Sequence, residues 1–412
     1  METKVIGIGA AGNKAAIALI EQEILDASHV MLLNSTLRDV PLNYKAIAKK
    51  FSDTLGGCGK ERKLAQQFMI NALQNDVFNL EGFIDPKDDM IIIASSSEGG
   101  TGCGASIVLA EYIHEVLSIP VHMFVFTGFE EDARGLANTV EYFQELDSSF
   151  TVQAISNKKF LDETGNKLRA EKEANNAFAS KVRTIMGIDL VDRTQNIDET
   201  DLKKIVNTPG FMVVETVNIT SKLKNTAMFN ELCASLIDNT SSLDFDPSAK
   251  RIGVILNIGE KTKDFIDYSF STLKSKLGSP FELYTHIQSE NDPEFISVIA
   301  SGINLPIEDI EAVYNKYMEE SSKVEKKKDA FFSKAKGFTH MEEDSIFDSA
   351  TKRMTNKLVP DASVKKSFFN KFNKTNNYNF NNILNERAKS QITTQQPAAT
   401  VVNLSGSDIE NV

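Results

Sequence analysis

A glycine-rich segment in the first third of the chain separates an apolar run from a helical pattern. Residues 99–104 read Gly99, Gly100, Thr101, Gly102, Cys103 and Gly104. The apolar run covers 90–94, and residues 107–113 have apolar side chains at helical spacing. Glycines let a backbone approach an anion closely, and the N–H groups and positive dipole end of a helix bind that anion without a lysine. The segment therefore predicts a phosphate-binding turn between a buried strand and a helix.

A second glycine-rich turn lies near the amino terminus. Residues 7–13 fit Gly-x-Gly-x-x-Gly between a predicted strand at 4–8 and a predicted helix at 13–23. This spacing is also the fingerprint of dinucleotide-binding dehydrogenases, which need an acidic residue about 20 positions later for the ribose. The second predicted strand, 29–33, is followed by Asn34 and carries no carboxylate at its end. An NAD-dependent oxidoreductase therefore stays a secondary hypothesis.

The third glycine-rich segment, 56–59, precedes Lys60 but does not complete the common phosphate loop of nucleotide hydrolases. That loop needs Ser or Thr after the lysine and a further glycine upstream. Here Glu61 follows the lysine, and Thr54 stands at the upstream glycine position. The segment therefore does not match this phosphate loop.

The elements that must position these turns alternate between strand and helix as far as residue 157. Because such alternation is typical of a parallel sheet covered on both faces, ligands are expected at the carboxyl ends of the strands. Predicted strands lie at 4–8, 29–33, 90–94, 120–126 and 151–155, and predicted helices at 13–23, 60–78, 107–117 and 134–146.

The second half of the chain begins with a long helical pattern, 167–186, which we expect to join two domains. A smaller α+β unit is predicted to follow it. Its strands are expected at 211–217, 251–258, 281–287 and 295–301, with helices at 221–237, 261–277 and 306–336.

Composition places the chain among soluble proteins. Its 412 residues are 41% hydrophobic, and the longest apolar runs are far shorter than the roughly 18 residues of a membrane helix. Three widely spaced cysteines predict a reducing cytoplasm. A net charge of −12 excludes a nucleic-acid-binding surface over the whole protein, yet residues 352–389 hold nine basic and two acidic side chains, about +7.

The Gly-Gly-Thr-Gly-Cys-Gly run resembles the signature loop of the tubulin/FtsZ family of nucleotide-dependent filament proteins. The resemblance covers roughly residues 1–310 and implies a Rossmann-like parallel-sheet GTPase domain, joined by a long core helix to a smaller α+β domain. The implied organisation is a nucleotide-binding domain at 1–165, the core helix and connection at 166–209, an α+β activation domain at 210–305, a helical region at 306–348 and a flexible basic tail at 349–412.

The resemblance also implies which residues contact GTP or GDP with Mg²⁺. The loop under the diphosphate matches the first turn, the loop at 34–39 helps to order metal and phosphates, and the loop at 55–59 senses the terminal phosphate. An acid and an arginine four positions later contact the sugar and base region, an asparagine recognises guanine, and a residue on the long helix, among Asn175, Asn176 and Phe178, lies near the base. The implied nucleotide-binding residues are Gly9, Ala10, Ala11, Gly12, Asn13, Asn34, Gly56, Gly57, Gly99, Gly100, Thr101, Gly102, Cys103, Gly104, Glu130, Arg134, Asn157 and Phe178.

Hydrolysis in this family is completed by an acidic loop of the neighbouring subunit. The matching segment here is 210–218, where the family's asparagine and two acids are replaced by Val213, Glu215 and Asn218. A single positioned acid still accelerates a reaction about 10²–10⁴-fold. Glu215 is therefore the predicted catalytic residue and Asn218 an orienting one.

The basic tail resembles that of the divergent plasmid and phage tubulins of the TubZ type. This resemblance implies a head-to-tail filament that segregates DNA through a small DNA-binding adaptor held by the tail, with no membrane partner and no sequence-specific DNA contact of its own. The alternatives are an FtsZ-like cell-division filament, a non-polymerising nucleotide-binding module and the oxidoreductase above. The expected location is the cytoplasm of a bacterial host.

Overall fold

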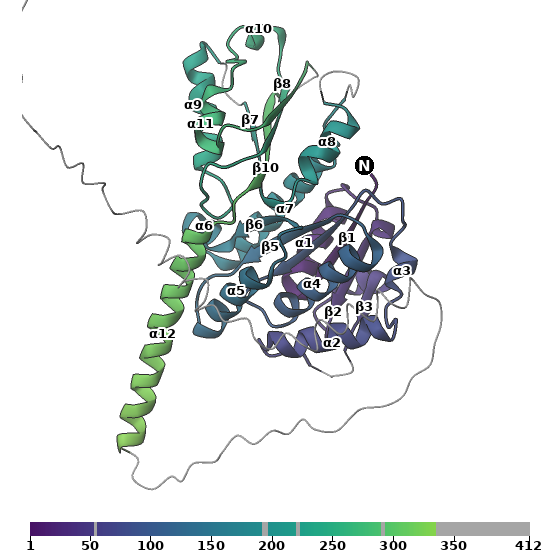
Figure 1. The fold of residues 1–412 in the computed structure, drawn as a ribbon, viewed down its shortest axis with the longest axis vertical. Coiled ribbons are helices and arrows are strands. Elements are labelled where there is room, and N and C mark those ends of the chain that lie inside the picture. Colours follow the sequence, from purple (N-terminus) through teal and green to yellow (C-terminus); the bar gives the residue numbers. More distant parts are fainter. Residues whose placement is uncertain (53–55, 192–196, 220–222, 290–292, 335–412) are drawn as a thin grey trace, which may run out of the picture. The chain divides into compact units, whose positions relative to one another are not determined.

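The computed structural model describes residues 1–52, 56–191, 197–219, 223–289 and 293–334, all within one compact unit. Ten strands form a single sheet in the order β3-β2-β1-β4-β5-β6-β7-β10-β8-β9 (Figure 1). The strands are β1 (Thr3–Ile8), β2 (Val30–Asn34), β3 (Ala48–Lys50), β4 (Met90–Ser96), β5 (Val121–Thr127), β6 (Thr151–Ser156), β7 (Gly210–Asn218), β8 (Arg251–Asn257), β9 (Glu282–Gln288) and β10 (Phe295–Ile303).

The sheet is parallel from β3 to β7 and mixed beyond that strand. Strand β10 runs antiparallel to both β7 and β8, and β9 pairs in parallel with β8. The predicted second unit therefore continues the first sheet. The link is the parallel pairing of Thr151 with Gly210 and of Val152 with Phe211.

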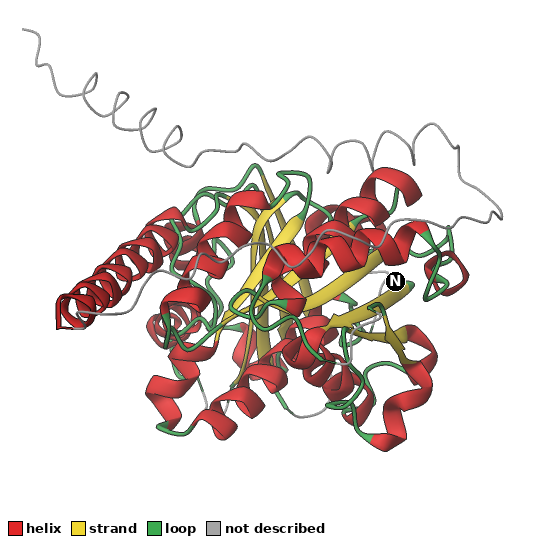
Figure 2. Cartoon of the chain, turned by 90° about the horizontal axis from the view of Figure 1, so that it is seen from below, coloured by secondary structure: helices red, strands yellow, loops and turns green. Residues whose placement is uncertain are grey.

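Helices cover both faces of the sheet, as the strand–helix alternation predicts (Figure 2). The short helices α3, α6 and α8 and the strand β3 were not predicted from the sequence. The α-helices are α1 (Gly9–Glu21), α2 (Arg62–Gln74), α3 (Leu80–Phe83), α4 (Thr101–Tyr112), α5 (Ala133–Glu145), α6 (Asn157–Thr164), α7 (Lys167–Ile185), α8 (Glu199–Val206), α9 (Thr226–Asp238), α10 (Glu260–Lys263), α11 (Ser271–Leu277) and α12 (Ile307–Lys334).

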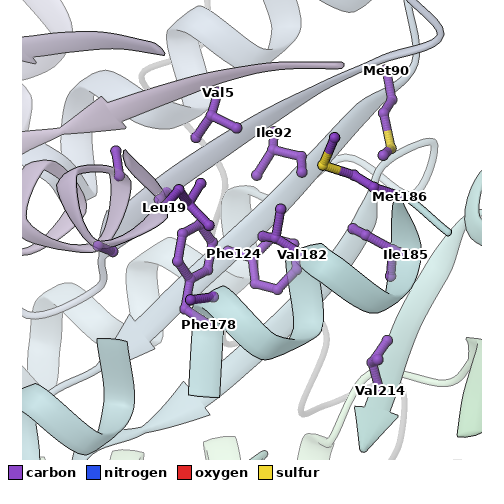
Figure 3. Packing of buried hydrophobic residues seen from close by; sticks show 14 of the residues in the cluster. Val5, Leu19, Met90, Ile92, Phe124, Phe178, Val182, Ile185, Met186 and Val214 are labelled. Carbon is purple, nitrogen blue, oxygen red and sulfur yellow. The ribbon is translucent and has the colours of Figure 1, made fainter. Parts of the chain in front are cut away.

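The long helix α7 organises the main hydrophobic core. Its 19 residues span about 28 Å at 1.5 Å per residue. Phe178 and Val182 point toward Phe124 of β5, and the rings of Phe124 and Phe178 meet edge to face at 5.0 Å (Figure 3). Val214 of β7 belongs to the same buried cluster. Helix α7 thus packs on the parallel strands and on the first strand of the second half, as expected for a connecting helix.

The helix predicted over 261–277 is wrong, because the chain forms two short helices there. Phe270, just before α11, has a φ of 48°, which interrupts a right-handed helix. Asp267 holds the intervening turn by accepting hydrogen bonds from the hydroxyls of Ser269 and Ser271 at 2.5 and 2.7 Å. Local side-chain bonds of this kind compete with a continuous helix.

The predicted domain boundaries remain predictions, because the described residues all fall in one unit. The tail at 349–412 and the end of the helical region, 335–348, lie outside the described residues. Among the described helices, none has the length and apolar character that a membrane crossing requires.

A buried histidine ties β5 to the connection that leads into β7. His122 is 1% exposed, and its Nε2 lies 2.8 Å from Oδ1 of Asn207, the residue after α8. Burial lowers the pKa of His122 to about 4, and the hydrogen bond to Asn207 only partly opposes this shift. The imidazole is therefore neutral in the folded protein at neutral pH.

We expect His122 to make the protein less stable in mild acid. An unfolded histidine has a pKa of about 6.5, so between that pH and about 4 the unfolded chain binds one more proton than the folded chain. Over this window the free energy of unfolding should fall by about 3 kcal/mol. Thermal melts of wild type and His122→Gln at pH 7, 6, 5 and 4 measure the effect. The variant should lose less stability on acidification, and identical pH profiles would contradict the assignment.

Candidate functional site

Two helices begin side by side where the strand order of the sheet reverses. Helix α1 follows β1 and α4 follows β4, and these neighbouring strands are parallel. A Cβ atom on Gly9 would lie 3.0 Å from the backbone nitrogen of Gly102, so the two helix starts are in contact. Ligands of open α/β sheets bind at the carboxyl ends of strands at such a reversal point.

Neither of these two helices has a side-chain cap at its start. The residues before them, Ile8 and Gly100, make no capping hydrogen bond. Helices α5 to α9 are each capped by an Asp, Ser or Asn side chain. Helices α2, α3, α10 and α11 also lack a cap, but α1 and α4 are the pair that begin in contact at the strand-order reversal. The first N–H groups of a helix lack partners within it, so α1 and α4 together offer a cluster of donors to an anion.

The glycines of the signature loop divide into two groups. A Cβ atom would lie 2.7 Å from the Glu61 nitrogen if added to Gly100, 2.9 Å from the Ile8 oxygen if added to Gly102, and 2.0 Å from the Arg62 oxygen if added to Gly104. These three glycines are required for close backbone packing. A Cβ on Gly99 would instead meet nothing within 4 Å among the described atoms, so Gly99 faces the open side of the loop.

A cavity of about 350 Å³ lies beside the start of α1. It is formed by α1, the end of β2 with the loop after it, and the first half of α7. The predicted residues Ala10, Asn13 and Asn34 line it, together with Asn175 and Asn176 of α7. Its size is in the range of small-molecule and cofactor sites. The structure thus brings the first glycine turn and the asparagines of the long helix to one cavity.

Asn13 has a buried amide without a protein partner. Its side chain is 4% exposed, and neither Nδ2 nor Oδ1 makes a hydrogen bond in the described part of the chain. Leaving a buried polar group unpaired costs about 1–3 kcal/mol. Because Asn13 also lines the cavity, the unpaired amide is the expected feature of a residue that bonds to a bound ligand.

The loop predicted to sense the terminal phosphate is held at its end by α5. Gly56 and Gly57 are exposed, and Leu55 lies outside the described residues. Glu61 pairs with the predicted sugar-contacting Arg134 at 2.7 Å, and Asn138 donates a hydrogen bond to the Lys60 carbonyl at 3.0 Å. Arg134 therefore anchors this loop, and it does not line the cavity at α1.

Glu130 and Asn157 also lie outside the lining of that cavity. Glu130 has a φ of 57°, and its carboxylate pairs with Lys316 of α12 at 2.8 Å, while its N–H donates to Glu98. Burial raises the pKa of Glu98. Asn157 is 8% exposed at the start of α6, directly after β6. Their predicted contacts with sugar and base stay predictions.

The prediction that Phe178 contacts the base is wrong in this structure. Its side chain is 0% exposed and is packed between Phe124 and Phe126 in the core. Asn175 and Asn176, one turn earlier on α7, line the cavity in its place. A periodic pattern gives the buried face of a helix only to within a residue or two, so the sequence left this choice open.

The predicted catalytic residues lie on β7, not in a free loop. Glu215 has a side chain only 14% exposed and is paired with Lys181 of α7 at 2.8 Å. Asn218 is exposed at the last position of the strand. Glu215 is therefore engaged inside its own subunit, and its catalytic role stays a prediction.

Several charged residues around the site were missed by the sequence analysis. Lys14, one turn after Ala10 on α1, and Lys172 of α7 line the cavity, and Lys14 pairs with Glu171 at 2.7 Å. Helical spacing from the first glycine turn would have indicated Lys14. In the described residues, no group of three or more His, Cys, Asp or Glu side chains could hold a metal ion.

Known proteins resemble this chain in sequence and in fold. No protein-family model matches the chain. The cell division protein FtsZ of Coxiella burnetii is 26% identical over 296 residues, covering 64% of this chain and 71% of that protein. The GTPγS-form protofilament of Bacillus thuringiensis serovar israelensis TubZ matches with a TM-score of 0.63 and 17% identity, covering 81% and 94% of the two chains. The GTPγS-bound protofilament of CetZ2 from Haloferax volcanii matches with a TM-score of 0.63 and 16% identity, covering 78% and 100%.

The chain has the fold of the tubulin/FtsZ superfamily. The predicted fold class is confirmed. The TubZ and CetZ structures match equally well, and the sequence relative is an FtsZ. The fold alone therefore does not separate the TubZ type from other members of the superfamily.

We expect Asn13→Ala to separate ligand binding from folding. Because the amide has no protein partner, its removal should leave the free protein equally stable or more stable, and should weaken GTP binding about tenfold. Asn138→Ala is the matched control, since the Asn138 amide donates to Lys60 and Glu98 and its loss should lower the melting temperature. Calorimetric titration with GTP and thermal melts measure both effects. Unchanged GTP affinity in Asn13→Ala would remove this residue from the site.

Proposed function

We propose that this protein binds GTP at the start of α1 and α4, assembles head to tail into filaments, and hydrolyses GTP at a site completed by the next subunit. One observation carries the proposal. Two uncapped helix N-termini meet at the strand-order reversal, beside a cavity that holds the unpaired Asn13 amide. A phosphate chain at the helix starts and a nucleoside in the cavity would satisfy both features.

The residues present fit a nucleoside triphosphate with Mg²⁺. The backbone N–H groups after Gly9 and Gly100 would hold the phosphates, and Asn13, Asn175 and Asn176 would bind the sugar or base. Mg²⁺ would neutralise phosphate charge, since it is bound mostly through phosphates, waters and one or two carboxylates. Asp39 lines the cavity and is the carboxylate we assign to that role.

Filament formation is supported by the solved relatives, because the TubZ and CetZ2 structures are both described as protofilaments. We propose that the filament segregates plasmid or phage DNA in the cytoplasm of a bacterial host. The basic tail, about +7 between 352 and 389, would hold a small DNA-binding adaptor. A cell-division filament is the second candidate, since the similar curated protein from Coxiella burnetii is a cell division protein.

GTP-dependent assembly tests the proposed function directly. Purified protein with GTP and Mg²⁺ should show a rise in light scattering above a threshold concentration, and no rise with GDP. Thr101→Ala should bind GTP about five- to tenfold more weakly and shift the threshold upward, because the variant loses a hydroxyl donor at the start of α4. Thr200→Ala, at an exposed position of α8, is the control. Wild-type protein that binds no GTP would refute the proposal.

Removal of the tail tests whether the filament functions in DNA segregation or in cell division. Truncation after Ser349 should leave GTP hydrolysis and assembly unchanged but abolish co-sedimentation of filaments with centromere DNA and its adaptor. Recruitment by the full-length protein should weaken steeply with salt, because the Debye length falls from about 10 Å at 0.1 M to about 3 Å at 1 M. Many weak contacts along a filament add through avidity. Equal pelleting by the truncated form would favour the division function.

A further inference from the structure

A buried lysine on the long helix holds the predicted catalytic acid. Lys181 has a side chain only 3% exposed, and its Nζ lies 2.8 Å from Oε1 of Glu215. The same ammonium group donates a hydrogen bond to the carbonyl of Val214. Lys181 follows Phe178 by one helical turn on the buried side of α7, so it is a charge placed in an otherwise apolar surface.

Glu215 is held from the other side by the turn that follows α9. Its Oε1 accepts hydrogen bonds from the Thr240 hydroxyl at 2.6 Å, the Ser241 N–H at 3.0 Å and the Ser241 hydroxyl at 3.3 Å. One carboxylate oxygen therefore accepts from four donors, which belong to two separate segments, α7 and the turn after α9. A base that acts on a ligand of another molecule needs a free oxygen within reach of that ligand. In Glu215 all four contacts fall on Oε1, so this oxygen is committed within its own subunit.

The turn at 240–241 also contacts the nucleotide-binding half of the chain. The Ser156 N–H, at the end of β6, donates to the Ser241 carbonyl at 2.8 Å. Lys159 of α6 donates to the Thr240 carbonyl at 3.5 Å and pairs with Asp244 at 2.6 Å. Because Asn157 directly follows Ser156, the turn joins Glu215 to the segment that carries the predicted guanine contact.

We propose that Glu215 is a positioning residue and that Lys181 is the partner that fixes it. The pair, with Thr240 and Ser241, locks β7 to α7 and to the end of β6 within one subunit. It thereby sets the position of the exposed end of β7, where Asn218 lies, for contact with the next subunit. This inference rests on the proposed function only for its effect on assembly.

A double-mutant cycle tests the pair. Lys181→Met leaves the Glu215 carboxylate without its counter-charge, and Glu215→Gln leaves the Lys181 ammonium buried without one. Breaking a buried ion pair on one side is strongly destabilising, while removing both charges is often nearly neutral. In the double variant the Gln oxygen still accepts from Thr240 and Ser241. The matched control is the exposed pair Lys158 and Asp162 on α6, with side chains 41% and 63% exposed, changed to Met and Asn singly and together.

Each single variant at the buried pair should melt at a lower temperature and raise the assembly threshold about tenfold. The double variant should recover both properties, and its GTP hydrolysis per polymerised subunit should stay close to the wild-type rate. The control pair should show no coupling. If Glu215 were purely catalytic, the double variant would not combine a restored assembly threshold with an unchanged rate of GTP hydrolysis.

Two results would overturn the inference. One is single variants that melt like the wild type or whose effects simply add. The other is normal assembly of Glu215→Gln and of the double variant with hydrolysis slowed about 10²–10⁴-fold, which would make Glu215 catalytic. Failure of the proposed function would give a different result: the wild-type protein would neither bind GTP nor assemble. The thermal cycle would still decide the role of the pair in that case.

Discussion

The unpaired N–H groups at the starts of α1 and α4 are the constraint on which the site depends. Every helix leaves its first donors without an internal partner, and in α5 to α9 a side chain at the helix start bonds to one of them. The two helices at the strand-order reversal have no such cap. Their donors need an anion or water, and the contact between Gly9 and Gly102 brings both sets of donors to one place. The position of β1 beside β4 thus creates the proposed phosphate site from backbone groups alone.

A buried cation joins the helices around this site. The start of α2 carries Arg62, a fully buried guanidinium that contacts the Cys103 sulfur and forms two 2.6 Å hydrogen bonds to Glu145 of α5. These hydrogen bonds and the charge of Glu145 raise the pKa of Arg62, although burial opposes the shift. Arg62 therefore joins α4, the start of α2 and α5. The segment that is predicted to sense the terminal phosphate ends just before this contact.

A buried charge, that of Lys181, also helps to attach the second half of the molecule to the first. Strand β7 extends the parallel sheet, and α7 packs on both halves through one hydrophobic cluster. Lys181 and Glu215 add a polar contact between α7 and β7. The geometry of this contact is specific, whereas apolar packing alone would tolerate small shifts of α7 relative to β7. Whether buried ion pairs provide specificity differs between proteins, and here the bonds to Thr240 and Ser241 satisfy the remaining capacity of one carboxylate oxygen. The charge network thus defines how the two halves meet.

The sequence by itself determined the fold class and the position of the glycine-rich turns, because glycine spacing and strand–helix alternation are local properties. It also indicated the boundaries of most long elements and identified Asn13 and Asn34, which line one cavity. It left Asn175 and Asn176, which line the same cavity, as alternatives to Phe178. It did not separate the packing glycines, such as Gly104, from the open Gly99, since that difference lies in which backbone faces each Cα. Only the tertiary structure decided that Phe178 belongs to the core and that Glu215 is bound by Lys181. Both facts depend on neighbours more than 30 residues away in the chain, and such contacts leave no periodic signal in the sequence.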